Sequence, residues 1–240
     1  MQHIGILLAG GKGSRMKRPG DDKLLREIHN STPFRLCYES FLGSKIVDNV
    51  IIVYRDNDQL EKINQEIEVA HKKSKKSFSP IFAKGGMERY ESVLTGLSVC
   101  YSECEFVYVH DCARPLIRSG TIDELGNIAK VSGAAITARP INDTIKKIFP
   151  NPTSRNQNTY RSETIDRSFI WIMETPQVCR KDWLLRGMKK IEAEKILVTD
   201  EASILELINK EVSLHDPGYP NPKITTNSDW PYIEFLLSQR

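Results

Sequence analysis

Near its N-terminus the chain reads Ile4-Gly5-Ile6-Leu7-Leu8-Ala9-Gly10-Gly11-Lys12-Gly13-Ser14-Arg15-Met16. A short apolar run passes into a glycine-rich turn that ends in cations, and Lys23 follows a little further along. Glycines let backbone N–H groups approach a phosphate closely. The start of a following helix adds positive potential, and Arg15 and Lys23 can neutralise phosphate charge. The pattern therefore predicts a strand followed by a binding site for a nucleoside triphosphate.

The spacing of the glycines separates this turn from two common nucleotide-binding turns. A P-loop has two glycines four residues apart, followed by Lys and Ser or Thr, and the sequence Gly-Gly-Lys-Gly-Ser-Arg does not match it. The dinucleotide fingerprint Gly-x-Gly-x-x-Gly begins at Gly11 but meets Met16 at its last position. A tight turn between a strand and a helix, without any ligand, is the alternative interpretation of the same residues.

Composition excludes several functional classes. The chain has 240 residues, of which 40% are hydrophobic and 27% charged, as in a soluble domain with a sizeable core. Its net charge of +3 is too small to indicate a nucleic-acid or membrane-surface partner. No apolar run reaches the roughly 18 residues of a membrane span, and the strand-like start argues against a signal peptide. The five cysteines, an odd number without CxxC pairs, are typical of a cytoplasmic protein, which is the location we expect.

Apolar runs typical of strands alternate with helical patterns along the chain. Strands are predicted at Ile4–Leu8, Val50–Tyr54, Phe106–His110 and Ala134–Ala138. Helices are predicted at Phe34–Leu42, Asp58–Ala70, Arg89–Tyr101, Thr121–Lys130, Asp182–Ala193, Glu201–Asn209 and Asp229–Leu237. This alternation predicts βαβ units and a mostly parallel sheet. Ligands bind at the carboxyl ends of the strands in such sheets, where the glycine turn and the His110-Asp111 pair fall.

The pattern changes between about residues 140 and 172. Two strands are predicted there, at Ile141–Ile148 and Thr164–Ile172, with a polar, proline-punctuated segment between them. These features indicate a long hairpin that leaves the domain. Because an isolated hairpin is only marginally stable in water, we expect it to pack against another subunit.

The strand predicted at Phe106–His110 is followed by Asp111, Arg114 and Pro115. A carboxylate opposite a phosphate-binding turn is a natural Mg²⁺ ligand, although Asp111 is also a plausible turn or helix cap. Arg114 precedes a proline and is therefore held in extended geometry, from which it can bind an anionic substrate. His110 alone is more often a core histidine with its hydrogen bonds satisfied.

A second glycine turn, Gly85-Gly86, leads into a helical segment that contains Ser92. Its N–H groups and the Ser92 hydroxyl can read the edge of a base, and an ordinary helix start is the alternative. Thr199 or Asp200 is predicted to cap a later helix. Lys223 lies in a predicted strand edge, where a single lysine is usually solvated.

Taken together and in this order, these groups resemble the cytidylyltransferases that make CDP-methylerythritol from CTP and 2-C-methyl-D-erythritol 4-phosphate. The similarity spans nearly the whole chain and rests on Ala9–Met16, Gly85–Leu97, Val109–Pro115, Asp143–Lys146, Asp166-Arg167, Thr175-Pro176-Gln177, Thr199–Glu206 and Asn221–Thr226. It implies one α/β domain over residues 1–240, with a doubly wound, mostly parallel, Rossmann-like nucleotidyltransferase sheet. It also implies a protruding β-arm at about 140–172, which embraces a second subunit and makes a homodimer.

The resemblance implies that a phosphate oxygen of the substrate attacks the α-phosphorus of CTP and that pyrophosphate leaves, with Mg²⁺ or another divalent cation as cofactor. The implied catalytic cations are Arg15, Lys23 and Lys223, and the implied metal ligand is Asp111. The implied nucleotide-binding residues are Ala9, Gly10, Gly11, Gly13, Gly86 and Ser92. The implied substrate-binding residues are Arg114 and the arm residues Thr144 and Arg167, which reach into the neighbouring subunit's site. The expected partners are CTP, a small polyol phosphate and a second copy of the chain.

Departures from the family pattern leave alternatives open. Relatives usually have Pro-Lys-Gln where this chain has Asp22-Lys23-Leu24, so Lys17 competes with Lys23 as the loop cation. Acidic residues beside that lysine oppose triphosphate binding unless they face away. A sister enzyme that uses ribitol 5-phosphate is the nearest alternative, and a regulator that binds CTP without turnover is another. A dehydrogenase is disfavoured because the third glycine and an acidic ribose-binding residue are missing.

Overall fold

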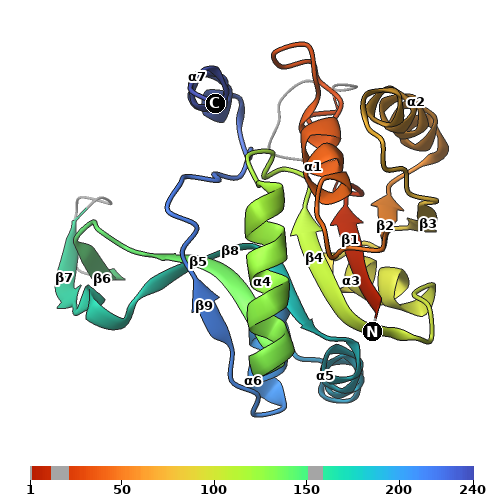
Figure 1. Ribbon diagram of the computed structural model, residues 1–240. Coiled ribbons are helices and arrows are strands. Elements are labelled where there is room, and N and C mark those ends of the chain that lie inside the picture. The colour runs from red at the N-terminus through yellow and green to blue at the C-terminus, as the bar shows by residue number, and fades with distance from the viewer. Residues whose placement is uncertain (1, 12–21, 151–158) are drawn as a thin grey trace.

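The computed structural model describes residues 2–11, 22–150 and 159–240. Seven strands in these ranges form the main sheet in the order β3-β2-β1-β4-β8-β5-β9 (Figure 1). Their bounds are β1 Gln2–Leu8, β2 Asn49–Tyr54, β3 Ile81–Lys84, β4 Cys104–Asp111, β5 Ala134–Pro140, β8 Trp171–Arg180 and β9 Ser213–His215. The sheet is mostly parallel, as predicted, and β8 runs antiparallel to both of its neighbours.

Helices cover both faces of this sheet. On one face lie α1 (Pro33–Leu42), α2 (Asn57–Lys73) and α4 (Ser119–Ser132), and on the other lie α3 (Arg89–Ser98), α5 (Lys181–Glu194) and α6 (Glu201–Leu207). The last helix, α7 (Trp230–Ser238), is labelled in Figure 1, and its Trp230 and Ile233 belong to a third, smaller apolar cluster. The predicted doubly wound α/β architecture is therefore confirmed.

Side-chain alternation in the central strands explains the two layers. In β2, Val50 and Ile52 point into the core under α1, whereas Ile51 and Val53 point into the core under α3. Because both faces of the strand are buried, its sequence is a continuous apolar run, as expected for a parallel strand. At Gly5 a Cβ atom would lie 2.8 Å from the Phe41 ring, so the glycine lets α1 pack closely on β1.

The order of the strands reverses at the centre of the sheet, because β2 lies on one side of β1 and β4 lies on the other. The carboxyl ends of two such strands frame the crevice in which open α/β sheets bind ligands. The register places Leu8, directly before the glycine turn, opposite Asp111 at the end of β4. Two motifs about a hundred residues apart in sequence thereby meet at one edge of the sheet.

A separate two-stranded sheet stands off from the main one (Figure 1). It pairs β6 (Ile145–Pro150) with β7 (Tyr160–Ile165) in antiparallel register. The predicted hairpin is present, but its strand bounds were wrong. The predicted strand Ile141–Ile148 began too early, and the predicted strand Thr164–Ile172 is interrupted by a 3-10 turn at Arg167–Phe169. This turn forms because the Asp166 carboxylate accepts the Ser168 N–H at 3.0 Å.

Three further features bear on the functional classes. None of the helices in the described ranges is long and apolar enough to cross a membrane. All five cysteines are free thiols. The prediction of a strand edge at residues 221–226 was wrong. This segment has no regular secondary structure before the 3-10 turn at Asn227–Asp229.

Candidate active site

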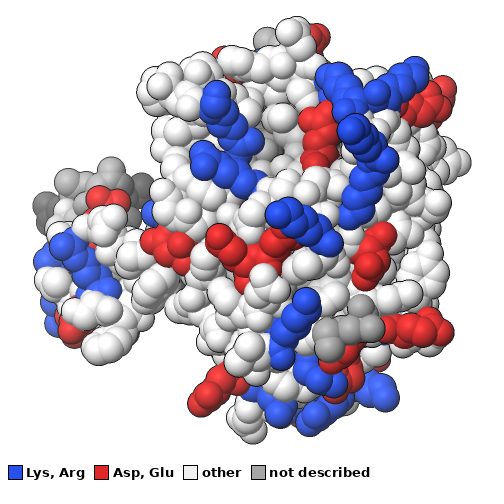
Figure 2. Space-filling view, viewed as in Figure 1, with Lys and Arg blue, Asp and Glu red and all other residues white. Residues whose placement is uncertain are grey.

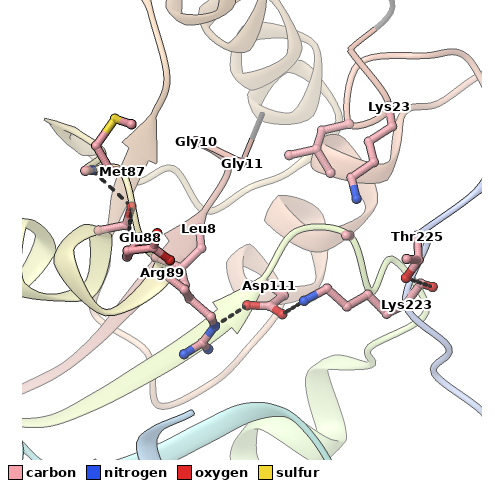
Figure 3. A pocket seen from close by; sticks show the side chains of 14 residues that line it. Leu8, Gly10, Gly11, Lys23, Met87, Glu88, Arg89, Asp111, Lys223 and Thr225 are labelled. Carbon is pink, nitrogen blue, oxygen red and sulfur yellow. Dashed lines mark hydrogen bonds and ion pairs between the residues drawn. The ribbon is translucent and has the colours of Figure 1, made fainter. Parts of the chain in front are cut away.

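A cavity of about 360 Å³ opens at the crevice between the ends of β1 and β4 (Figure 3). Its walls come from the glycine turn after β1, the glycine turn before α3, the end of β4 and the segment after residue 221. Of the residues singled out in the sequence, those that line it are Gly10, Gly11, Lys23, Gly86, Ser92, Asp111 and Lys223. The fold thus brings together groups from these four parts of the chain and from a fifth, at Lys23.

Asp111 is the carboxylate at the centre of the site. Its Oδ1 accepts the Nε–H of Arg89 at 3.1 Å, and its Oδ2 accepts the ammonium of Lys223 at 2.5 Å. Burial by itself raises the pKa of a carboxyl group, but the charges of Arg89 and Lys223 outweigh it and hold the pKa of Asp111 well below its ordinary value. The Asp111 N–H donates to the Thr175 hydroxyl at 3.1 Å, which fixes the backbone here.

Arg89, which sequence reasoning did not single out, links Asp111 to a second buried carboxylate. Its Nη1 and Nη2 donate to the two oxygens of Glu201 at 2.7 and 3.0 Å. Glu201 is fully buried, and this burial raises the pKa of its carboxyl while the Arg89 charge lowers it. The pKa of Arg89 rises despite its own burial, because both carboxylates favour the charged guanidinium. The result is an ion-paired network behind the cavity.

The glycine turn before α3 is held by its own helix. Glu91 accepts the N–H groups of Met87 and Glu88 at 2.7 and 3.0 Å, and the Ser92 hydroxyl accepts the Gly86 N–H at 3.1 Å. A Cβ atom at Gly86 would lie 2.4 Å from the Glu91 Cβ, so glycine is required there. Ser92 therefore shapes the turn, and its proposed contact with a base remains a prediction.

Lys23 lies across the cavity from the turn before α3 (Figure 3), and its ammonium donates to the Ile224 carbonyl at 2.8 Å. Its neighbour Asp22 faces away, where its Oδ2 accepts from Gln59 at 2.6 Å and from Arg55 at 3.2 Å. The expected conflict between Asp22 and a phosphate is thus avoided. Gly13, Arg15 and Lys17 lie outside the described residues.

Four of the proposed site residues are placed away from this cavity. Ala9 is fully buried and donates its N–H to the Val53 carbonyl at 2.8 Å. Arg114 lies behind the β4 end, where it donates to the Asn221 carbonyl at 2.9 Å. Thr144 and Arg167 are exposed at the base of the hairpin. The roles of these four residues in binding nucleotide or substrate therefore stay predictions.

His110 and Gln177 hold the surrounding loops. His110 contacts the Thr175 hydroxyl at 3.0 Å and the Arg114 carbonyl at 3.2 Å, as expected for a satisfied core histidine. Gln177 accepts the Ala202 N–H at 2.9 Å and donates to Asp200 at 3.0 Å, which ties the start of α6 to β8. Asp200, one of the two predicted caps, is the N-cap of α6.

Comparisons with known proteins agree along the whole chain. Residues 4–239 match the family described as IspD, 2-C-methyl-D-erythritol 4-phosphate cytidylyltransferase. A relative of that name from Geobacillus thermodenitrificans is 31% identical, with 100% of this chain and 99% of the relative covered. Another from Dictyoglomus thermophilum is 33% identical, with 98% and 96% covered.

Solved structures of proteins with these names have the same fold. The 4-diphosphocytidyl-2C-methyl-D-erythritol synthase from Anaerococcus prevotii superposes with a TM-score of 0.81 at 24% identity, covering 100% of this chain and 99% of that one, and supports the fold. The Francisella tularensis 2-C-methyl-D-erythritol 4-phosphate cytidylyltransferase superposes with a TM-score of 0.74 at 25% identity, covering 98% and 100%. With a match of this extent, the chain belongs to the 2-C-methyl-D-erythritol 4-phosphate cytidylyltransferase family.

Proposed function

We propose that this protein transfers CMP from CTP to 2-C-methyl-D-erythritol 4-phosphate, giving CDP-methylerythritol and pyrophosphate. The observation that carries the proposal is the meeting of Asp111, Lys23 and Lys223 around one cavity at the switch point of the sheet, where the glycine turn begins. Family membership supplies the substrate pair, and this arrangement supplies the charges that a triphosphate needs.

The attacking phosphate oxygen is already an anion, so the reaction needs no strong general base. Catalysis is then a matter of positioning and of stabilising charge on the phosphates. Lys23 and Lys223 line the cavity on the side away from Met87 (Figure 3) and suit this task. Glu201 is not available as a base, because both of its oxygens are bonded to Arg89.

A divalent cation fits Asp111 as a shared ligand, not as part of a protein cage. The described residues contain no group of three or more His, Cys, Asp or Glu side chains that could hold a metal. Mg²⁺ often takes one or two carboxylates and completes its shell with substrate phosphates and water. When bound, the ion would add positive charge near the α-phosphate. Lys223, now on Asp111, would then be free to contact phosphate.

We further propose that the hairpin docks on a second copy of the chain. Its base and strands carry exposed apolar side chains, of which Phe169 is 89% exposed and Tyr160 51%. Such side chains favour burial in an interface. Figure 2 shows blue cationic side chains on the same projection, where Lys146, Lys147 and Arg161 are exposed. Thr144 and Arg167 at this base would then reach a polyol phosphate in the partner's site.

The test is pyrophosphate release with CTP against a panel of polyol phosphates, each with and without Mg²⁺. We expect metal-dependent release with 2-C-methyl-D-erythritol 4-phosphate and little with the others. Preference for ribitol 5-phosphate would replace the proposed substrate. CTP binding without release in any mixture would favour a regulator. The five free thiols agree with a reducing compartment such as the cytoplasm, the location that we propose.

A further inference from the structure

We propose that Arg89, held by Glu201, is a positioning residue that immobilises Oδ1 of Asp111 and reserves Oδ2 for a cation in the cavity. The inference rests on the proposed nucleotidyl transfer, in which Asp111 is a metal ligand. One guanidinium divides its donors between two carboxylates: Nε binds Asp111 (Figure 3), and Nη1 and Nη2 bind Glu201.

Arginine usually binds a carboxylate through two parallel N–H groups. Here that two-pronged contact goes to Glu201, through Nη1 and Nη2. Only Nε is left for Asp111, and it reaches Oδ1 alone at 3.1 Å. Glu201 thereby prevents Arg89 from binding both oxygens of Asp111.

The second oxygen of Asp111 faces the solvent side of the network. Its partner is Lys223, whose side chain is 37% exposed, whereas the Glu201 side chain is fully buried. A lysine ammonium is a single mobile charge on a flexible stem, so it can leave a carboxylate more readily than a fixed guanidinium can. Oδ2 is therefore the oxygen whose cation can change when ligands bind.

Glu201 is itself anchored and can act as a fixed point. It is the first residue of α6, directly after the N-cap Asp200. The neighbouring Ala202 N–H donates to Gln177, and the Gln177 amide donates to Asp200. The start of α6 is thus bonded to β8, next to the Thr175 hydroxyl that accepts the Asp111 N–H. Backbone and side chain of Asp111 are both held from this side.

The experiment compares Arg89→Lys and Glu201→Gln with wild type. Arg89→Lys keeps the charge but loses the divided contact, and Glu201→Gln frees the guanidinium to bind both Asp111 oxygens. The direct readout is Mn²⁺ affinity, measured by electron paramagnetic resonance with a non-hydrolysable CTP analogue. Because outer partners of a metal ligand typically contribute about 10–100-fold to affinity or activity, we expect both variants to weaken Mn²⁺ binding by about tenfold or more. Steady-state kinetics should show the loss in kcat, with KM for the polyol phosphate nearly unchanged.

Arg180→Lys is the matched control, since Arg180 also pairs with two carboxylates, Glu105 and Asp182, but at the other end of β8. It should leave Mn²⁺ affinity and kcat as in wild type. If either single variant fails to fold, the double variant Arg89→Met/Glu201→Gln removes both charges together and avoids an unpaired buried ion. It too should lose Mn²⁺ affinity.

Folded variants that bind Mn²⁺ as tightly as wild type would overturn the positioning role and leave Arg89 and Glu201 as supports of the fold. Failure of the proposed function has a different signature. In that case wild type itself releases no pyrophosphate, while Mn²⁺ binding by the variants still decides whether Arg89 positions Asp111.

Discussion

The wall of the cavity at Asp111 and the hairpin β6–β7 differ in how their polar groups are held. Around Asp111, Arg89 from α3 and Lys223 from the segment after residue 221 converge on one carboxylate, and the fully buried Glu201 of α6 holds Arg89 in turn. On the hairpin, Lys147 and Arg161 lie over the ring of Phe149, and Lys146 donates to Thr164, so the contacts stay within the hairpin. A single chain thus builds the charged centre by itself, whereas the hairpin offers an exposed surface that we propose is covered by a second copy of the chain.

The largest effect should follow from removing a cation that we propose to be catalytic. We expect Lys23→Ala and Arg15→Ala each to lower kcat by about 10²–10³-fold, since each removes a positive charge that, under the proposed mechanism, stabilises the phosphates. Pyrophosphate release measures the loss, and thermal unfolding should change little. Lys62→Ala, an exposed lysine on α2, is the control. Near-normal rates in both variants would contradict the mechanism.

The second prediction concerns the stability contributed by Asp111 in metal-free protein. Its folded pKa lies below the ordinary 3.8, so its ionised form stabilises the fold above that pH, and the contribution is lost as pH falls through the folded value. Asp111→Asn should cost about 3 kcal/mol at pH 7, because Arg89 and Lys223 lose a charged partner. Urea unfolding from pH 7 to pH 3 should show the difference from wild type shrinking below about 3.8. A difference that is constant with pH would show that the charge of Asp111 does not matter.

The hairpin should give a smaller and more selective effect. We expect Arg167→Ala to raise KM for the polyol phosphate by about tenfold, the usual size for one lost charged hydrogen bond, while KM for CTP stays the same. Initial rates at varied concentrations of each substrate measure both values. An unchanged requirement for the polyol phosphate would refute a role of the hairpin in substrate binding.

Mixing variants sharpens the comparison between the two regions. In a mixed dimer of Lys23→Ala and Arg167→Ala chains, one site receives an intact Lys23 from its own chain and an intact Arg167 from its partner. We therefore expect the activity of the mixture, at a low concentration of polyol phosphate, to exceed the sum of the activities of the two variants measured separately. Activity equal to that sum would place Arg167 in the site of its own chain.

The smallest effect should come from Ser92. Ser92→Ala removes the hydroxyl that accepts the Gly86 N–H and loosens the turn before α3. One such hydrogen bond contributes about 1 kcal/mol, so KM for CTP should rise by about fivefold without a change in KM for the polyol phosphate. Ser98→Ala, near the end of the same helix, is the control.

The sequence predicted the elements whose periodicity is strong. Strands β1, β2, β4 and β5 and the helices around them were placed within a few residues, because apolar side chains buried on both faces leave a continuous signal. Short β3 and β9 were missed, and so was most of β8, of which the prediction covered only Trp171 and Ile172, together with its antiparallel direction. Four- and three-residue strands carry too little periodicity to be recognised, and strand direction depends on partners far away in the sequence.

The sequence predicted those residues of the candidate site whose role is indicated by a local motif. The glycine turn, Asp111 and Lys223 were singled out, and the fold brings their described parts together. Arg89 and Glu201 were not singled out, because each has the sequence context of an ordinary residue in the first turn of a helix. Their contact depends on how α3 and α6 pack in the fold, and no local sequence pattern encodes that packing. The fit of the hairpin to a partner stays a prediction.

The pairing of Leu8 with Asp111 has a consequence for how such a chain tolerates change in length. Adjacent residues of a strand point to opposite faces, so deleting or inserting one residue within β4 before Asp111 would turn its carboxylate away from the glycine turn after β1. The connection between α2 and β3, at residues 74–80, carries no such constraint. Length variation that spares catalysis should therefore accumulate in that connection and be purged from the two central strands.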